Sequence, residues 1–94
     1  MKHQKLVDET ISERAKIYGA PIDSHTNIGL AWTGMIQQHY DGLRLPHPIT
    51  PALAAQMMAV FKLIRSGRTY HADNYIDLAA YAKFAEEFQK EEKK

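Results

Sequence analysis

The sequence predicts an all-α protein, a compact four-helix domain whose third and fourth helices form an antiparallel hairpin. Three observations predict this fold. Four segments repeat apolar residues at a three-to-four spacing, helix-start and helix-stop residues separate these segments, and the alternation typical of strands is missing. A chain of 94 residues has room for one domain. We therefore assign residues 1–94 to a single helical domain, with 89–94 as a charged, frayed tail.

The first helical segment is amphipathic and has a clear end. Thr10 and Glu13 have the spacing of a capping box, so the helix begins there or earlier. Gly19 and Pro21 stop it. One face of the segment carries Leu6, Val7, Ile11, Arg14, Ala15 and Tyr18.

The second helix is predicted to start near Asp23 or Ser24, since either residue is a competent N-cap. Its apolar face carries Ile28, Ala31, Trp32, Met35 and Ile36. Gly29 and Gly34 weaken a helix by about 1 kcal/mol each relative to Ala, so we expect them to mark close packing against a neighbour. The stretch 41–48, with one glycine and two prolines, is predicted to be a loop.

The third helix has the clearest start in the chain, because Thr50 can cap it and Pro51 suits its first position. Ser66 and Gly67 end it. Its predicted apolar face consists of Leu53, Met57, Val60, Phe61 and Ile64.

The fourth helix is predicted to open at Asp73 or Asn74, whose side chains can bond free backbone N–H groups. Its apolar residues are Ile76, Leu78, Tyr81, Ala82, Phe84, Ala85 and Phe88. The loop before it is short, and a short loop pairs two helices as an antiparallel hairpin.

Asp77 is the most informative polar position, because its neighbours from Tyr75 to Ala82 are all apolar or aromatic. A carboxylate buried there without a partner would cost several kcal/mol. A hairpin folded about residues 69 and 70 places Lys62 opposite Asp77, and Arg65 opposite Asn74. The Lys62–Asp77 pair has two interpretations: a structural ion pair that fixes the helix register, or part of a cationic site for phosphate oxygens.

The distribution of charge along the chain favours an anionic ligand more than the net charge of the protein does. The formal net charge is only +1, too small for strong DNA binding, and no DNA partner is expected. No Asp or Glu occurs from Gly42 to Ala72. Aromatic rings that could stack on a base include Tyr70 and Tyr75. The candidate ligand-binding set is Tyr18, Trp32, Lys62, Arg65, Arg68, His71, Asn74 and Asp77.

Asp73 and Asp77 are a candidate metal pair, since residues four apart share a helix face and oxygen ligands suit Mg²⁺. The alternative role of Asp73 is a helix cap. The chain has no cysteine and no HExxH motif, so no zinc site is expected. No apolar run resembles a signal peptide or a membrane span, which predicts a cytoplasmic protein with no membrane partner.

Four strings occur in order between Ser12 and Phe88: ERAKIYGAP, NIGLAW, ITPALAAQMMAVFKLIR and HADNYIDLAAYA. Together they resemble a small all-helical domain of unknown function found in many bacteriophage genomes. The resemblance implies a phage origin and a helical fold, and it implies no particular activity. It singles out as motif positions Tyr18, Gly19, Pro21, Met58, Lys62, Arg65, His71, Asp73, Asp77 and Tyr81.

More remotely, the fold and the acidic last helix resemble the MazG-like all-helical nucleoside triphosphate pyrophosphatases. Those enzymes hold Mg²⁺ with two carboxylate pairs on facing helices, whereas the third helix here offers Lys62 and Arg65 and no acid. The resemblance implies a second acidic pair elsewhere, for which Glu9, Glu13 and Asp23 are the candidates.

Three functions follow as hypotheses. The first is a cytoplasmic protein of the infected bacterial host, a homo-oligomer, that binds a phosphorylated nucleotide or cyclic nucleotide and sequesters a host immune signal without any certain cofactor. The second is a Mg²⁺-dependent nucleoside triphosphate pyrophosphatase. The third is an inhibitor that binds a host protein through a helical face.

Overall fold

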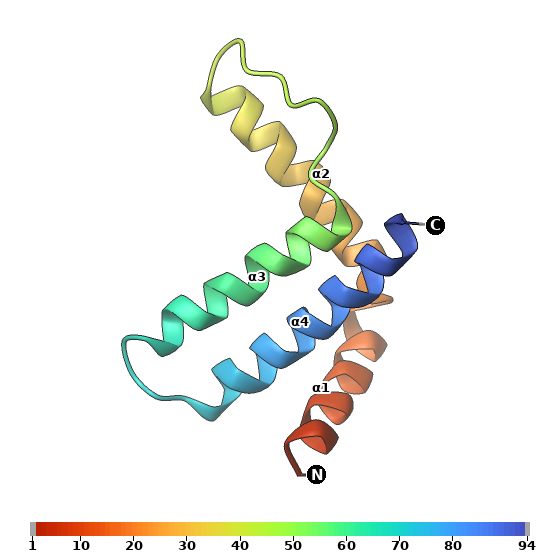
Figure 1. Ribbon diagram of the computed structural model, residues 1–94, viewed down its shortest axis with the longest axis vertical. Helices are drawn as coiled ribbons and strands as arrows, with labels where there is room; N and C mark the ends of the chain where they lie inside the picture. The colour runs from red at the N-terminus through yellow and green to blue at the C-terminus, as the bar shows by residue number, and fades with distance from the viewer. Residues whose placement is uncertain (1, 94) are drawn as a thin grey trace.

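The computed structural model of the protein describes residues 2–93, apart from the side chains of residues 2, 3, 15, 17 and 18. Four helices follow one another along the chain: α1 (Lys2–Tyr18), α2 (Pro21–His39), α3 (Pro51–Ser66) and α4 (Ala72–Glu92). No strand occurs among the described residues. The two helices α3 and α4 lie side by side and run in opposite directions (Figure 1). The predicted all-α class, the four helices and the hairpin are confirmed.

The helix starts depend on proline and on backbone bonds more than on side-chain caps. The predicted start of α3 is confirmed, since the Thr50 hydroxyl accepts a hydrogen bond from the Leu53 N–H at 3.1 Å. By contrast, the N-cap of α2 is Ala20, three residues before Asp23 and four before Ser24, because the fixed φ angle of Pro21 suits the first helical position. The N-cap of α4 is His71, whose carbonyl accepts from the Asn74 N–H at 3.1 Å.

The C-terminal segment that we expected to fray continues α4 as far as Glu92. The carboxylate of Glu92 accepts a hydrogen bond from the backbone N–H of Ala52 at 3.3 Å. This bond satisfies one of the free N–H groups in the first turn of α3. The end of α4 is therefore joined to the start of α3.

At the contact between the two hairpin helices, small side chains of α3 meet an alanine and phenylalanines of α4. The buried cluster consists of Ala52, Ala55, Ala85 and Phe88, with Phe84 packed against it. The predicted apolar face of α3 lies on the other side of the helix and is exposed: its five side chains leave from 37% to 70% of their surface open to solvent. Alanines allow the helix axes to approach closely, so the bulkier residues are turned outward.

A glycine and a threonine hold α2 against the segment that precedes α3. The Thr33 hydroxyl donates to the Gly29 carbonyl and accepts from the Ile49 N–H, both at 2.7 Å. A Cβ at Gly29 would collide with the Ile49 carbonyl oxygen. The expected close packing is thus confirmed at Gly29, whereas a Cβ at Gly34 would meet nothing within 4 Å.

Replacing Thr33 by Val is expected to lower the free energy of unfolding by about 1.5 kcal/mol, because the buried Ile49 N–H loses its acceptor. Urea unfolding followed by circular dichroism measures the change. Thr33→Ser keeps the hydroxyl and serves as the control, since it should retain most of the stability. Equal losses for the two variants would show that the hydroxyl bond contributes little.

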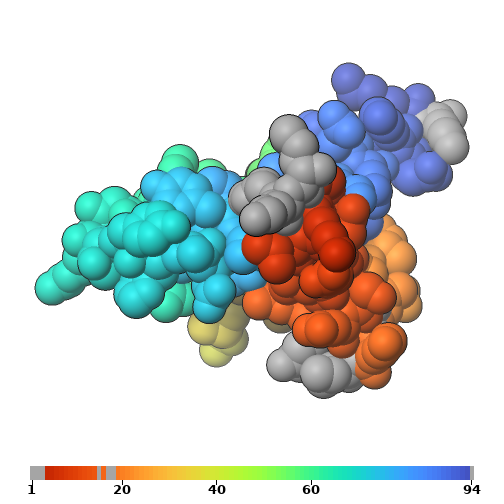
Figure 2. Space-filling model, turned by 90° about the horizontal axis from the view of Figure 1, so that it is seen from below, coloured from red at the N-terminus to blue at the C-terminus, as the bar shows by residue number. Residues whose placement is uncertain are grey.

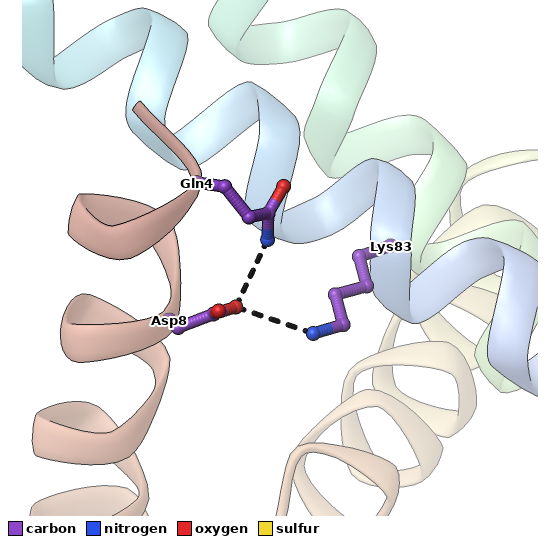
Figure 3. Close-up of polar contacts among 3 residues, drawn as sticks. All are labelled: Gln4, Asp8 and Lys83. Atoms are coloured by element: carbon purple, nitrogen blue, oxygen red, sulfur yellow. Dashed lines mark hydrogen bonds and ion pairs between the residues drawn. The ribbon is translucent and has the colours of Figure 1, made fainter. Parts of the chain in front are cut away.

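Polar contacts and one buried side chain attach α1 to α4. Asp8 accepts from the Gln4 amide at 3.0 Å and from the Lys83 ammonium at 3.3 Å (Figure 3). The Gln4 hydrogen bond, followed by the Lys83 hydrogen bond, lowers the pKa of the Asp8 carboxyl. Val7 of α1 is almost completely buried. Figure 2 shows α1 between the turn end of the hairpin, on the left, and the C-terminal end of α4, at the upper right.

The arrangement of the helices is open. Its radius of gyration is 14.6 Å, whereas a compact domain of this length has a value of about 12 Å. The C-terminal half of α2 extends away from the other helices, and the chain then returns to the start of α3 (Figure 1). None of the helices in the described part of the chain is both long and apolar enough to cross a bilayer.

Candidate functional site

Asp77 lies between two cations. The Lys62 ammonium is 3.1 Å from one carboxylate oxygen of Asp77, and the Arg14 guanidinium is 2.9 Å from the other. The predicted Lys62–Asp77 pair is confirmed. The sequence analysis did not identify Arg14 as the second partner, although an arginine on the apolar face of its helix was a signal that could have found it.

The same register places Arg65 opposite Asn74, and no hydrogen bond joins these two described residues. The Arg65 guanidinium instead lies 5.5 Å from the centre of the Phe61 ring, and the Lys62 ammonium lies 5.7 Å from the same ring. A cation is attracted to the face of an aromatic ring, and this contact keeps Arg65 on the exposed flank of α3. Asn74 is buried.

A half-open pocket of about 440 Å³ lies between α1, α2 and α4. Its volume falls in the range of small-molecule sites, and such sites combine an apolar lining with a few polar groups. The lining has this character: Ile11, Ile28, Ala80 and Phe84 are apolar, and Arg14, His25 and Tyr81 carry the main polar groups.

His25 lines this pocket and has a buried ring nitrogen without a hydrogen-bond partner. The residue is 4% exposed, and its Nδ1 is 2.8 Å from the Pro21 carbonyl oxygen. Since a carbonyl only accepts, Nδ1 must carry the proton, and Nε2 of the neutral ring is then an acceptor. Among the described residues Nε2 is buried and has no hydrogen-bond partner. Buried polar atoms are nearly always paired, so the unpaired Nε2 is unusual.

Aromatic rings surround the imidazole of His25. The rings of Tyr81, Phe84 and Phe88 have their centres 5.8, 5.8 and 5.6 Å from it. Burial raises the pKa of the Tyr81 phenol; the nearby charge of Arg14 lowers it, and that of Asp77 raises it. The phenol therefore stays protonated and can donate a hydrogen bond at neutral pH.

A family model described as a domain of unknown function, DUF6378, matches residues 4–89. The chain belongs to this family. No curated protein and no solved structure matches the chain. The DUF6378 match covers α2, α3 and most of α1 and α4, and it includes Arg14, His25 and Tyr81 of the pocket.

The pocket of this DUF6378 domain does not include the ligand-binding residues predicted from the sequence. Of the predicted residues whose side chains are described, only Asp77 is linked to it, through Arg14. The prediction for Tyr18 concerns a side chain outside the described part of the structure. Lys62 and Arg65 do gather around the Phe61 ring. The remaining predicted residues, none of them lining the pocket, are Trp32, Arg68, His71 and Asn74.

The metal hypothesis stays a prediction. Each oxygen of Asp77 contacts a cation, and Asp73 is exposed in the first turn of α4. Within the part of the DUF6378 domain that the structure describes, no three His, Asp or Glu side chains gather into a cluster that could hold a metal ion. The geometry of Asp77 matches that of a structural ion pair.

Proposed function

We propose that this DUF6378 domain binds a phosphorylated nucleotide, linear or cyclic, in the pocket between α1, α2 and α4. The observation that supports the proposal most is the unpartnered Nε2 of His25, which lies buried beside aromatic rings in the wall of a pocket whose lining includes an arginine. Such a site requires a ligand with a flat apolar part, a hydrogen-bond donor and a negative charge.

Arg14 is the group that would bind the phosphate. Its side chain is 46% exposed and lines the pocket, while one of its nitrogens contacts Asp77. A guanidinium has five N–H donors in a planar fork that matches phosphate oxygens. The group formed by Arg14, Lys62 and Asp77 carries two positive charges and one negative charge. A positive charge therefore remains for an anionic ligand.

The base of the nucleotide would contact the aromatic residues. Phe84 and Tyr81 offer ring surfaces, and base stacking on such rings contributes about 1–3 kcal/mol. Nε2 of His25 has no solvent-exposed surface, so an amino group on the edge of the base would donate to it after a movement of the surrounding rings. This hydrogen bond would favour bases that carry an amine over bases that offer only carbonyl oxygens.

The resemblance to bacteriophage-encoded domains suggests a use for such binding in the cytoplasm of an infected cell. A protein that holds a nucleotide without altering it would sequester a signal of host immunity. The MazG-like alternative needs Mg²⁺ and hydrolysis, and the two cations on Asp77 argue against it. Pyrophosphate release from nucleoside triphosphates in the presence of Mg²⁺ separates the two functions.

Isothermal titration calorimetry with a panel of linear and cyclic nucleotides tests the proposal. We expect Arg14→Lys to weaken binding about tenfold, because lysine keeps the charge beside Asp77 and loses the fork that binds phosphate oxygens. The matched control is Arg68→Lys in the exposed turn after α3, which should leave the affinity unchanged.

Two results would contradict this site. If no nucleotide in the panel produces heat, the proposed ligand class is wrong. If Arg68→Lys weakens binding and Arg14→Lys does not, the phosphate binds at the end of α3, as the sequence analysis predicted. Circular dichroism of both variants checks that the helices are retained.

A further inference from the structure

We infer that the pocket between α1, α2 and α4 takes a nucleotide with a single phosphate, in preference to a nucleoside triphosphate or a dinucleotide. Nucleoside monophosphates and cyclic mononucleotides belong to this class. The inference rests on the proposed nucleotide binding and adds the number of phosphates to it. Two features of the pocket carry the inference: the cations in its lining and its volume.

Among the described residues that line the pocket, Arg14 is the one lysine or arginine. The polar lining is completed by the hydroxyl groups of Thr10, Ser24 and Tyr81 and by the imidazole of His25. A hydroxyl can donate a hydrogen bond to a phosphate oxygen, but it does not offset the charge of the phosphate. The lining therefore supplies one fixed positive charge.

The cations near the lining residues, in the sequence or in the ion group, do not add a second charge to the pocket. The Lys62 ammonium contacts the Asp77 oxygen that the pocket arginine does not contact. The Lys83 ammonium is 3.3 Å from the Asp8 carboxylate. Lys16 is exposed and lies two residues after the pocket arginine, and residues at this spacing do not face each other on a helix. None of these three lysines lines the pocket.

The charge of the ion group matches one phosphate. Arg14 and Lys62 bring two positive charges against the one negative charge of Asp77, which leaves a net charge of +1. A phosphate monoester carries about −1.5 to −2 at neutral pH, and a phosphodiester carries about −1. One phosphate therefore already uses the available positive charge. Each further phosphate would meet no cation in the lining and would gain no ion pair.

The volume of the pocket favours one base. A volume of about 440 Å³ lies in the lower part of the range of small-molecule sites, which is about 300–1,000 Å³. The rings that line the pocket are those of His25, Tyr81 and Phe84, and the centres of the last two are 6.4 Å apart. One base fills the space beside this ring cluster. The second base and second phosphate of a dinucleotide would therefore lie outside the pocket, in water.

Isothermal titration calorimetry along a phosphate series tests the inference. The series consists of the nucleoside and its mono-, di- and triphosphate for adenine, guanine and cytosine, the bases that carry an amine. Mg²⁺ is left out because it would neutralise the additional phosphates. We expect the monophosphate of the preferred base to bind about tenfold more tightly than its nucleoside, since it gains a charge-assisted contact with Arg14. The di- and triphosphate should bind no more tightly than the monophosphate.

The series separates failure of this inference from failure of the proposed function. An affinity that rises with each added phosphate would overturn the single-phosphate inference and leave nucleotide binding in place. No heat from any member of the series would overturn both. A cyclic dinucleotide that binds more tightly than the cyclic mononucleotide of the same base would also overturn the inference, because its ligand would extend beyond the pocket.

A cation added to the lining tests the cause of the preference. Thr10 lines the pocket one turn before Arg14 on the same face of α1, so Thr10→Arg supplies a second guanidinium. We expect this variant to raise the affinity for the triphosphate about tenfold relative to that for the monophosphate. The matched control is Ser12→Arg, which adds the same charge at an exposed position two residues from both, on the other side of the helix.

The control variant should leave the ratio of the two affinities unchanged. If Thr10→Arg does not change this ratio, or if Ser12→Arg changes it equally, the number of cations in the pocket does not set the number of phosphates and the inference is wrong. Circular dichroism of both variants checks that the helices are retained.

Discussion

Replacing Asp77 by Asn is expected to lower the free energy of unfolding by about 3 kcal/mol. The Asp77 side chain is 8% exposed and that of Lys62 is 14% exposed, so the substitution leaves an ammonium group largely buried without its counter-charge. Breaking a buried pair from one side costs about 3–5 kcal/mol. The lower value is appropriate because the second cation, Arg14, is half exposed and water screens it. Urea unfolding measures the loss.

The control for this variant is Asp73→Asn, one turn earlier on the same helix. Asp73 is exposed in the first turn of α4, where a negative charge interacts favourably with the helix dipole. Its loss should cost under about 1 kcal/mol. A loss of similar size in both variants would show that Asp77 is an ordinary helix carboxylate and not the centre of a buried ion group.

Two glycine substitutions on α2 are expected to change stability in opposite directions. Ala adds about 1 kcal/mol of helix propensity at either position. At Gly29 the new Cβ collides with the Ile49 carbonyl, and overpacking of this kind costs about 3 kcal/mol. Gly29→Ala should therefore lose about 2 kcal/mol, whereas Gly34→Ala should gain about 1 kcal/mol.

Thermal unfolding of the two glycine variants, measured side by side, checks this difference. Both variants add one methyl group to the same helix, so propensity and side-chain size are matched, and only the neighbour differs. If both Gly29→Ala and Gly34→Ala raised the stability, the segment at Ile49 would move away from α2 at little cost in free energy. The Thr33 hydrogen bonds to this segment would then be weak as well.

The hairpin and its register could be predicted from the sequence because the signals are local and strong. A capped proline start, a short loop and one carboxylate among apolar neighbours were enough to pair Lys62 with Asp77. A buried charge needs a partner, and the hairpin offered only a few positions opposite Asp77. The register alone did not predict the contact of Arg65, since its exposed guanidinium lies against its own helix neighbour, Phe61.

The direction in which α3 faces could not be predicted from its apolar pattern. Periodicity identifies which residues share a face, but it does not decide whether alanines or large side chains meet the next helix. Ala52 and Ala55 carry little hydrophobic signal and yet form the buried contact with α4.

The pocket could not be predicted from the sequence, because its residues come from three helices and share no motif. His25 and Tyr81 are 56 positions apart in the sequence, and only the crossing of α2 with α4 brings their rings to 5.8 Å. The Tyr81 position was singled out by the family resemblance alone. His25 had no sequence signal of its own, since its importance comes from an unpaired nitrogen that only the fold reveals.

The nitrogen resonances of the His25 ring provide the most direct test of the ligand site. A long-range proton–nitrogen correlation spectrum of the free protein, recorded at an alkaline pH at which imidazoles are neutral, should show the proton on Nδ1 and an Nε2 without a hydrogen bond. Addition of the tightest-binding nucleotide should shift Nε2 of His25 toward the value of a hydrogen-bonded acceptor, while the ring nitrogens of His39, His47 and His71 stay in place. An unchanged His25 at saturating nucleotide, or a shift at His71 instead, would contradict the account.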